Sequence, residues 1–301
     1  MSFREHDASV TRAAEAQKQQ ADVKAKLKAW RWSTNEALVD LFHELCGTTE
    51  IQVFIECGAH SAEDALRFLR SSPSGEAIAI EANPYVYEQR TRAAESLGVK
   101  TLNVGLSSQP GFLHLQIPNK RNATEPTVPY ASFLNHKDEQ DWPSKTVRCE
   151  VTTLDAVVTE PARDKPTALW IDVEGAAGDV LKGAEGVLRS GCVKLVMVEV
   201  ETKQLWKEQM VLSDIQEHLA AFGLIPVARD AQMGNTQFNV IFAQELDLES
   251  VRLVEKFRNS EVFDVGLLAE GDEDSLLRRL VSRARSKAAR FAGSLLRSSA
   301  D

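Results

Sequence analysis

The sequence has no uninterrupted apolar run of the roughly 20 residues that a membrane-spanning helix needs. Its first ten residues, MSFREHDASV, are charged and lack the apolar segment of a secretory signal, so we expect a cytoplasmic protein. Cysteine is scarce: Cys46, Cys57, Cys149 and Cys192 are scattered and form no CxxC pair. This pattern predicts reduced, buried thiols and argues against disulfides.

Positive charge is also scarce over most of the chain. The 301 residues include 35 Lys and Arg against 44 Asp and Glu, a net charge of −9, which argues against a nucleic-acid-binding protein. Residues 275–301 are the exception, with seven Arg or Lys and one Asp. The acidic body and the basic tail therefore need separate interpretations.

The basic tail, SLLRRLVSRARSKAARFAGSLLR, places its apolar residues on one helical stripe and Arg and Lys on the opposite face. This pattern predicts an interfacial helix in peripheral contact with an anionic membrane, such as the inner face of the cell membrane, or with an acidic partner. The alternative is a helix packed on the domain or on a partner subunit.

A second helical extension is predicted over residues 1–48. Residues 1–30 have only a weak apolar stripe, whereas Ser33–Glu36 forms a capping box that predicts a helix start, with Gly47 at its end. We expect a homo-oligomer, with the N-terminal helix as a candidate dimerisation element.

Between a C-terminal extension over 249–301 and the N-terminal one, residues 49–248 alternate apolar strands with helices. The alternation predicts an α/β domain with a doubly wound, mostly parallel sheet, closed by an antiparallel last strand. The strands are expected at 51–57, 76–81, 99–107, 167–173, 193–200, 224–229 and 237–243, and the helices at 61–70, 84–97, 176–188 and 208–222.

An insertion at about 108–150 interrupts this alternation. Strands predicted at 112–118 and 147–154 flank a polar segment rich in turn-forming residues. A long irregular insertion in a compact domain is usually functional or disordered, and we expect this one to cover the site.

Polar residues follow the strands at their carboxyl ends, where doubly wound sheets bind ligands. Gly58 after the first strand allows a ligand to approach closely, and Glu81 at the end of the second can accept hydrogen bonds from ribose. The segment after Gly58 is not a GxGxxG motif, and Ala59 and Ala62 are alanines rather than glycines, so a pyrophosphate has no obvious cradle. S-adenosylmethionine, with one nucleoside and no phosphate, fits better, and Glu56 suits its cationic amino-acid half.

Several segments, in this order and spacing, resemble the FkbM family of S-adenosylmethionine-dependent methyltransferases. They are FIECGAH (54–60), IEANPYVYEQ (80–89), NVGLSS (103–108), VTTLD (151–155), IDVEGAAGDVLKGA (171–184) and VMVEVE (196–201). The resemblance covers about residues 51–245. It implies a Rossmann-like class I methyltransferase fold with six parallel strands and one antiparallel strand, and O-methylation of sugars or natural products.

The resemblance also implies roles for individual residues. Glu56, Gly58 and Ala59 match the first cofactor motif, Glu81 matches the ribose-binding acid, and Asp172, Glu174 and Gly175 match the strand-four signature. Asn83 and Asn103, which follow the second and third strands, complete the predicted cofactor site. The chain departs from the family pattern at His60, Ala62, Trp170 and Ala177, where Asn, Gly, Lys and Glu are usual.

Methyl transfer to a hydroxyl needs a base or a metal that lowers the hydroxyl pKa. Asp172, with Glu199, is the candidate for taking the proton directly or for binding a hard divalent cation such as Mg²⁺. His136, in the insertion, is a further candidate base, ahead of His60 and His114. Alternatively, Glu174 stabilises the helix dipole that follows it, and Asp172 only fixes the loop.

We therefore predict an S-adenosylmethionine-dependent O-methyltransferase that acts on a hydroxyl of a sugar, glycan or other small molecule. Two alternatives remain open. One is a non-catalytic binding or scaffold protein with a methyltransferase fold. The other is a nicotinamide-dependent oxidoreductase or epimerase, which the missing GxGxxG disfavours.

Overall fold

The computed structural model describes residues 29, 31–118, 131–137, 144–158, 164–231 and 236–260. The basic tail and most of residues 1–30 lie outside these ranges, so the membrane contact and the dimerisation element stay predictions. No helix within the described ranges has the length and apolar character needed to cross a bilayer.

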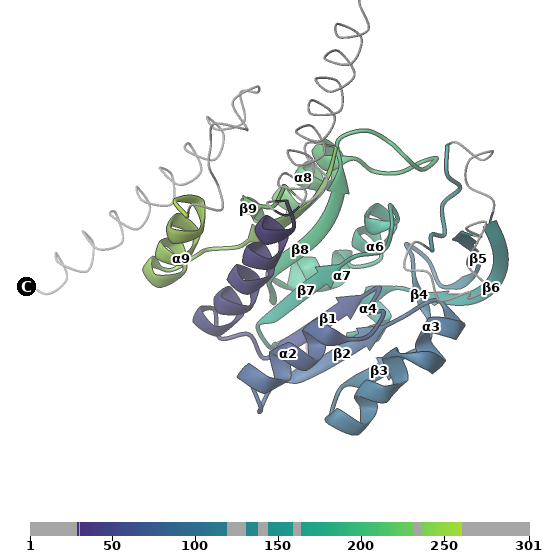
Figure 1. Ribbon diagram of the computed structural model, residues 1–301, viewed down its shortest axis with the longest axis horizontal. Helices are drawn as coiled ribbons and strands as arrows, with labels where there is room; N and C mark the ends of the chain where they lie inside the picture. The colour runs from purple at the N-terminus through teal and green to yellow at the C-terminus, as the bar shows by residue number, and fades with distance from the viewer. Residues whose placement is uncertain are drawn as a thin grey trace, which may run out of the picture.

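Seven strands of the described chain form one sheet in the order β3-β2-β1-β7-β8-β10-β9 (Figure 1). Neighbouring strands from β3 to β8 are parallel, whereas β10 runs antiparallel to both β8 and β9. Six strands thus share one direction and β10 opposes them, as the resemblance implied. The strands are β1 (Val53–Cys57), β2 (Glu76–Ile80), β3 (Lys100–Leu102), β7 (Thr167–Ile171), β8 (Val193–Glu201), β9 (Ile225–Arg229) and β10 (Gln237–Ala243).

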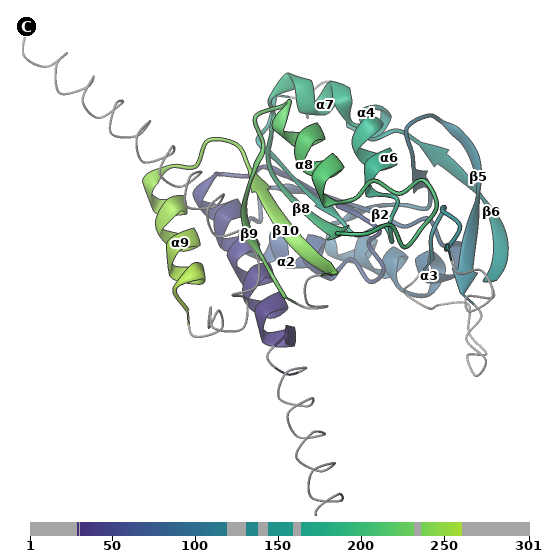
Figure 2. The same cartoon turned by 90° about the horizontal axis from the view of Figure 1, so that it is seen from above.

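Helices cover both faces of this sheet (Figure 2). One core cluster lies between the sheet and the helices α6, α7 and α8, and a second lies between the sheet, a helix over residues 31–48, α2 and α9. The helical elements are α2 (Glu63–Ser71), α3 (Pro84–Gln89), the 3₁₀ helix η1 (Thr91–Leu97), α4 (Leu154–Val157), α6 (Ala177–Lys182), α7 (Glu185–Ser190), α8 (Leu212–Ala220) and α9 (Leu248–Arg258).

Both predicted extensions contribute to the second core cluster. Leu38, Phe42 and Leu45 of the helix over 31–48 are fully buried, and Val254 and Phe257 of α9 are nearly so. The helix also begins before the predicted capping box: it includes residue 31, and the Thr34 hydroxyl accepts a hydrogen bond from the backbone N–H of Ala231 at 3.0 Å. Ser33 therefore lies inside the helix rather than at its cap, and the neighbouring Thr34 hydroxyl bonds to a distant segment.

The strand predicted over 99–107 is divided between two sheets. β3 pairs with β2, whereas β4 (Gly105–Leu106) pairs with β6 (Ser144–Thr152) in a small sheet that also contains β5 (Gly111–Pro118). The side-chain amide of Asn103 donates to the carbonyl oxygen of Glu81 at 2.8 Å, where the chain leaves the main sheet. β5 and β6 confirm the two strands predicted in the insertion.

The helix predicted over 176–188 is also divided, into α6 and α7. Gly183 lies at the break, where a Cβ atom would come within 2.2 Å of the carbonyl oxygen of Ser107. The Asp155 carboxylate accepts the N–H groups of Gly186 and Val187 at 2.8 and 2.7 Å, so it satisfies the start of α7. The VTTLD segment therefore anchors this second helix.

Candidate functional site

The site lies at the carboxyl ends of β1 and β7, where the strand order reverses. Gly58 joins β1 to the loop at this point with φ +83°, in the left-handed region that favours glycine. A Cβ atom on Gly58 would lie 1.8 Å from the carbonyl oxygen of Asp172, in the loop after β7. The glycine is therefore required both by its own conformation and by the close approach of these two loops.

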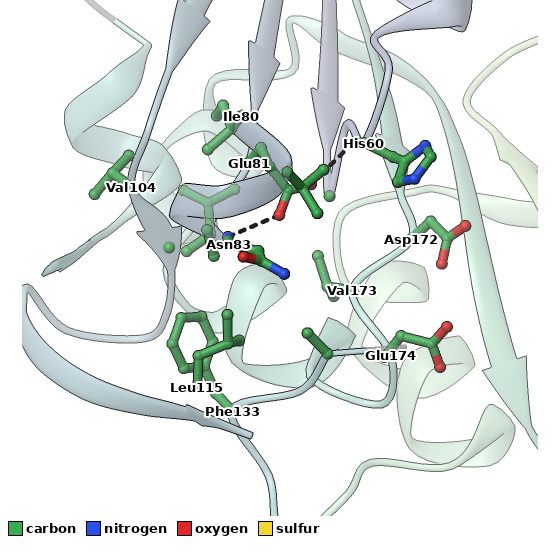
Figure 3. A pocket seen from close by; sticks show the side chains of 16 residues that line it. His60, Ile80, Glu81, Asn83, Val104, Leu115, Phe133, Asp172, Val173 and Glu174 are labelled. Atoms are coloured by element: carbon green, nitrogen blue, oxygen red, sulfur yellow. Dashed lines mark hydrogen bonds between the residues drawn. The ribbon is translucent and has the colours of Figure 1, made fainter. Parts of the chain in front are cut away.

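A cavity of about 270 Å³ opens between these strand ends and the inserted segment (Figure 3). One side carries polar groups from the strand ends, and the other is apolar. The polar residues are His60, Glu81, Asn83, Asp172 and Glu174; the apolar side chains include Ile80, Val86, Val104, Leu106, Leu115 and Phe133. This combination of an apolar wall with a few convergent polar groups is typical of small-molecule sites.

Glu81 is the polar residue held most firmly in the cavity. Its Oε2 accepts the backbone N–H of His60 at 2.9 Å, and its Oε1 accepts that of Asn83 at 2.8 Å (Figure 3). Burial raises the pKa of this carboxyl, while the two N–H groups favour its charged form. Each oxygen keeps a further lone pair, so the carboxylate can accept two hydroxyl groups of a ligand.

The other predicted cofactor residues support this loop rather than line the cavity, apart from Gly58 and Asn83. The Asn83 side chain accepts the N–H of Tyr85 at 3.1 Å and so caps the start of α3. Glu56 is buried, and its Oε2 accepts the N–H of Ala65 at 2.9 Å, in the first turn of α2. Glu56, Ala59 and Asn103 are not among the cavity residues.

The loops around the cavity contain a run of unusual backbone conformations. His60, Ala62 and Glu174 all have positive φ although they are not glycines. Such residues cost free energy and cluster at ligand sites, where the surrounding structure holds them in place. Ala62, which stands where the family has glycine, adopts the conformation that glycine would favour.

Three carboxylates come together beside the cavity, those of Asp172 and Glu174 after β7 and of Glu199 on β8, and the charge of Glu201, also on β8, acts on Glu174 and Glu199. Asp172, Glu174 and Glu199 each offer an oxygen, and these oxygens lie within 4.8 Å of one another. Figure 3 shows the carboxylates of Asp172 and Glu174 directed to the same side, away from Phe133. We refer to these four residues as the acidic cluster.

Burial raises the pKa of every carboxyl group in the acidic cluster, and the charge of at least one other member adds to the shift for Glu174, Glu199 and Glu201. Burial is the largest cause for Glu174, followed by the charges of Asp172 and Glu201. Burial is also the largest cause of the shift for Glu199, whose pKa lies well above its usual range, and for Glu201, whose pKa rises to about 7. Asp172 is exposed on one side, but protein atoms crowd its carboxyl and, with the charge of Asp64, raise its pKa.

The inserted segment 131–137 crosses from β5 to the loop after β8 and holds the strand-four signature. The Ser132 hydroxyl donates to the carbonyl oxygen of Glu174 at 2.7 Å, and Ser132 also pairs with Gln116 of β5. On the other side of this loop, a Cβ on Gly175 would lie 2.2 Å from the Trp206 ring, so the glycine admits the indole. Ser132 and Trp206 therefore fix the left-handed turn at Glu174.

His136 does not line the cavity. Its ring packs edge-on against Trp206, with centroids 5.1 Å apart, and the two residues form a β-bridge. Trp206 is itself 3% exposed and belongs to the local core. His60, the other histidine at the site, lines the cavity, and burial lowers its pKa, so the neutral imidazole is favoured near pH 7.

Sequence reasoning brought together Gly58, Glu81, Asn83 and Asp172, all of which line the cavity. It missed Glu201 as a member of the acidic cluster, although its spacing of two from Glu199 places both side chains on one face of β8. It also missed the apolar wall from Leu115 and Phe133, because no local signal in the insertion indicates which residues turn inward.

Comparisons with known proteins agree with this geometry. The model of the methyltransferase FkbM domain matches residues 56–226. The 2-O-methyltransferase NoeI of Sinorhizobium fredii (strain NBRC 101917 / NGR234) is 24% identical over 182 residues, which cover 58% of this chain and 73% of that protein.

Two solved structures are similar at low identity. The magnesium protoporphyrin IX methyltransferase of Synechocystis PCC 6803, with bound S-adenosylmethionine, is 6% identical, with a TM-score of 0.40 over 71% of this chain and 79% of that one. A Burkholderia thailandensis 1,6-didemethyltoxoflavin-N1-methyltransferase, with S-adenosylhomocysteine, is 12% identical, with a TM-score of 0.36 over 81% of this chain and 91% of that one.

Proposed function

Because this chain belongs to the FkbM methyltransferase family, we propose that it transfers the methyl group of S-adenosylmethionine to a hydroxyl of a sugar, glycan or other small molecule. The observation that carries the proposal is the cavity at the switch point, with the Glu81 carboxylate held in its wall. The name of the relative NoeI, a 2-O-methyltransferase, supports oxygen as the acceptor atom.

The two halves of the cavity suit the two parts of an adenosyl group. Both oxygens of Glu81 keep acceptor capacity, which matches the two hydroxyls of a ribose. The side chains of Val86, Val104 and Leu106 offer an apolar surface for a purine ring. The glycine turn at Gly58 brings backbone to the cavity with no side chain in the way.

The cofactor supplies an electrophilic methyl group: the acceptor oxygen bonds to the methyl carbon as the carbon–sulfur bond breaks, and the bonding pair returns to sulfur, which becomes a neutral thioether. The acceptor hydroxyl must lose its proton in this step, and a neutral hydroxyl is a poor nucleophile near pH 7. Asp172 lines the cavity and also belongs to the acidic cluster. We therefore assign the activation of the hydroxyl to Asp172 and its neighbour Glu199.

A turnover assay tests this function. Purified protein is incubated with S-adenosylmethionine and a panel of hydroxylated sugars and glycans, and formation of S-adenosylhomocysteine and of a methyl ether is followed by mass spectrometry. The proposal expects both products in equal amounts with at least one acceptor. S-adenosylhomocysteine binding without methyl ether from any acceptor would favour a binding or scaffold protein, and NAD⁺ binding without adenosyl-ligand binding would overturn the proposal.

A further inference from the structure

The acidic cluster presents an unusual concentration of oxygen donors. One oxygen each from Asp172, Glu174 and Glu199 lies within 4.8 Å of the other two. No histidine or cysteine belongs to this group, so its donors are of the kind that hard cations prefer. Groups of acidic side chains this close together are common at protein surfaces. Whether this one is a cation site therefore depends on the hydrogen-bond partners of its carboxylates.

The carboxylates of β8 are buried without a full set of partners. Glu201 is 2% exposed; the Gln209 side-chain amide donates to its Oε2 at 2.5 Å, but its Oε1 has no partner. The Oε2 atom of Glu199 is likewise buried and without a hydrogen bond. An unsatisfied buried carboxylate oxygen costs free energy, and here two occur on residues two positions apart on β8, where a cation or a hydrogen-bond donor would stabilise them.

No protein cation fills this role within the described ranges. The ion pairs recorded there involve other acids, namely Asp40, Asp64, Glu76, Glu88, Asp179 and Glu185. The four carboxylates therefore repel one another with no Lys, Arg or His paired to them in the described part of the chain. Like charges held this close together, with Glu201 buried, are normally neutralised by protons or by a bound metal ion.

We propose that Asp172, Glu174 and Glu199 bind a hard divalent cation, with Oε1 of Glu201 accepting a hydrogen bond from a water molecule on that ion. Calcium–oxygen bonds of about 2.3–2.6 Å place opposite ligands roughly 4.6–5.2 Å apart, and magnesium bonds of about 2.0–2.1 Å place them roughly 4.0–4.2 Å apart. The three oxygens, which lie within 4.8 Å of one another, can therefore surround one such ion after small side-chain movements that bring them closer together.

The position of the ion gives it a role that rests on the proposed methyl transfer. Asp172 and Glu174 line the cavity, so a cation on their carboxylates lies beside the space in which we place the acceptor. The exposed side of Asp172 leaves it a path from solvent. A cation that binds the acceptor hydroxyl lowers its pKa and orients its oxygen, and the released proton passes to a carboxylate of the cluster or to water.

Binding is measured on the full chain without an acceptor. The protein, freed of metal with a chelator, is titrated with Mn²⁺, and binding is followed by electron paramagnetic resonance; Mg²⁺ and Ca²⁺ are titrated by calorimetry. Titrations extend to about 10 mM, roughly ten times the weakest dissociation constants common for protein calcium sites. The same samples are titrated with S-adenosylhomocysteine, which tests the proposed function independently.

The variants are Asp172→Asn and Glu199→Gln, with Asp179→Asn as the matched control. Asp179 is an acid on neighbouring α6, paired with Lys182 and outside the cluster. We expect one cation per chain, an affinity at least tenfold lower in both cluster variants, unchanged affinity in the control, and a cation-dependent rise in melting temperature only where the ion binds.

Folded wild-type protein that binds no divalent cation would overturn the proposal, as would equal affinity in all three variants. Neither cluster substitution enlarges a side chain, and each removes a repelling charge, so we expect both variants to fold without a metal. Circular dichroism of the metal-free proteins checks this. Cation binding without S-adenosylhomocysteine binding would support the metal site and reject the proposed function. Binding of S-adenosylhomocysteine without a cation would support the proposed function and reject the metal site.

Discussion

Replacing Gly58 with alanine tests how the structure builds the site. The Gly58 backbone has φ +83°, and the added Cβ would lie 1.8 Å from the carbonyl oxygen of Asp172, where real Cβ atoms essentially never come closer than 3.0 Å. The loops after β1 and β7 must therefore move apart by more than 1 Å. These loops carry Gly58 and Asp172, which both line the cavity.

Gly191 provides a matched control for the magnitude. It also has a left-handed backbone, with φ +77°, but a Cβ there meets no atom within 4 Å. Gly191→Ala should cost only the conformational strain of about 1–2 kcal/mol. Gly58→Ala adds an overpacking cost of about 1–3 kcal/mol, so its total destabilisation should be about 2–5 kcal/mol.

Urea unfolding of wild type and both variants measures these free energies, and titration with S-adenosylhomocysteine measures the cavity. We expect Gly58→Ala to be less stable than Gly191→Ala and to lose most of its affinity, whereas Gly191→Ala binds as wild type does. Equal destabilisation of the two variants, with unchanged affinity in Gly58→Ala, would refute the close-approach argument.

Three further predictions follow from burial and charge. Burial raises the pKa of Glu56 well above its usual range, so the folded state favours its protonated form. Below about pH 4 Glu56 is protonated in both states and does not lower the free energy of unfolding; as the pH rises toward the folded-state pKa, that free energy falls. Glu56→Gln keeps an acceptor for the N–H of Ala65, so urea unfolding should find it more stable than wild type at pH 8, with the advantage gone near pH 4; a constant difference would contradict this. All four cysteines are buried, and burial raises the pKa of Cys149 to about 11, so a thiol reagent at pH 8 should label none in the native protein and four after unfolding. Asp172→Asn should lower kcat by about 10²–10⁴ with little change in S-adenosylhomocysteine affinity, while Asp179→Asn keeps wild-type turnover; full turnover in Asp172→Asn would remove its assigned role.

Sequence periodicity was sufficient for the sheet because each strand and helix has its own local signal. The strands around Gly58 and Glu81 are continuous apolar runs that end in polar residues, and parallel strands necessarily bring those ends to one edge. The hairpin of β9 and β10 was likewise predictable, since no helix separates the two strands. These features depend only on neighbours along the chain.

The remaining features depend on contacts between distant segments. The break between α6 and α7 arises because Gly183 packs against Ser107, 76 positions earlier in the chain. The helix over 31–48 includes its predicted start at Ser33, where the neighbouring Thr34 hydroxyl accepts a hydrogen bond from the distant Ala231. Trp170, a departure from the family pattern, packs edge-on against Phe42 of that helix, with centroids 5.7 Å apart. Local patterns do not specify such partners.

The acidic cluster was predictable from the sequence only in part. The sequence placed Asp172 and Glu199 at neighbouring strand ends, which the sheet order confirms. Their degree of burial, and the contribution of Glu201, depend on the loops after β7 and β8 and on the inserted segment that covers them. The charges could thus be located from the sequence, but their environment could not.

The most direct test of the central claim is calorimetric titration with S-adenosylmethionine and S-adenosylhomocysteine of wild type, Glu81→Gln and Glu76→Gln. Glu76 begins the same strand, is exposed, and pairs with Lys165 at the surface, so its substitution should leave affinity unchanged. Glu81→Gln sets an amide donor against the N–H of His60 or Asn83 and weakens the acceptor for ribose, at a cost of about 1–3 kcal/mol. We expect wild type and Glu76→Gln to bind both ligands and Glu81→Gln to lose roughly tenfold to hundredfold in affinity. Folded wild-type protein that binds neither ligand, or equal binding by Glu81→Gln, would contradict it.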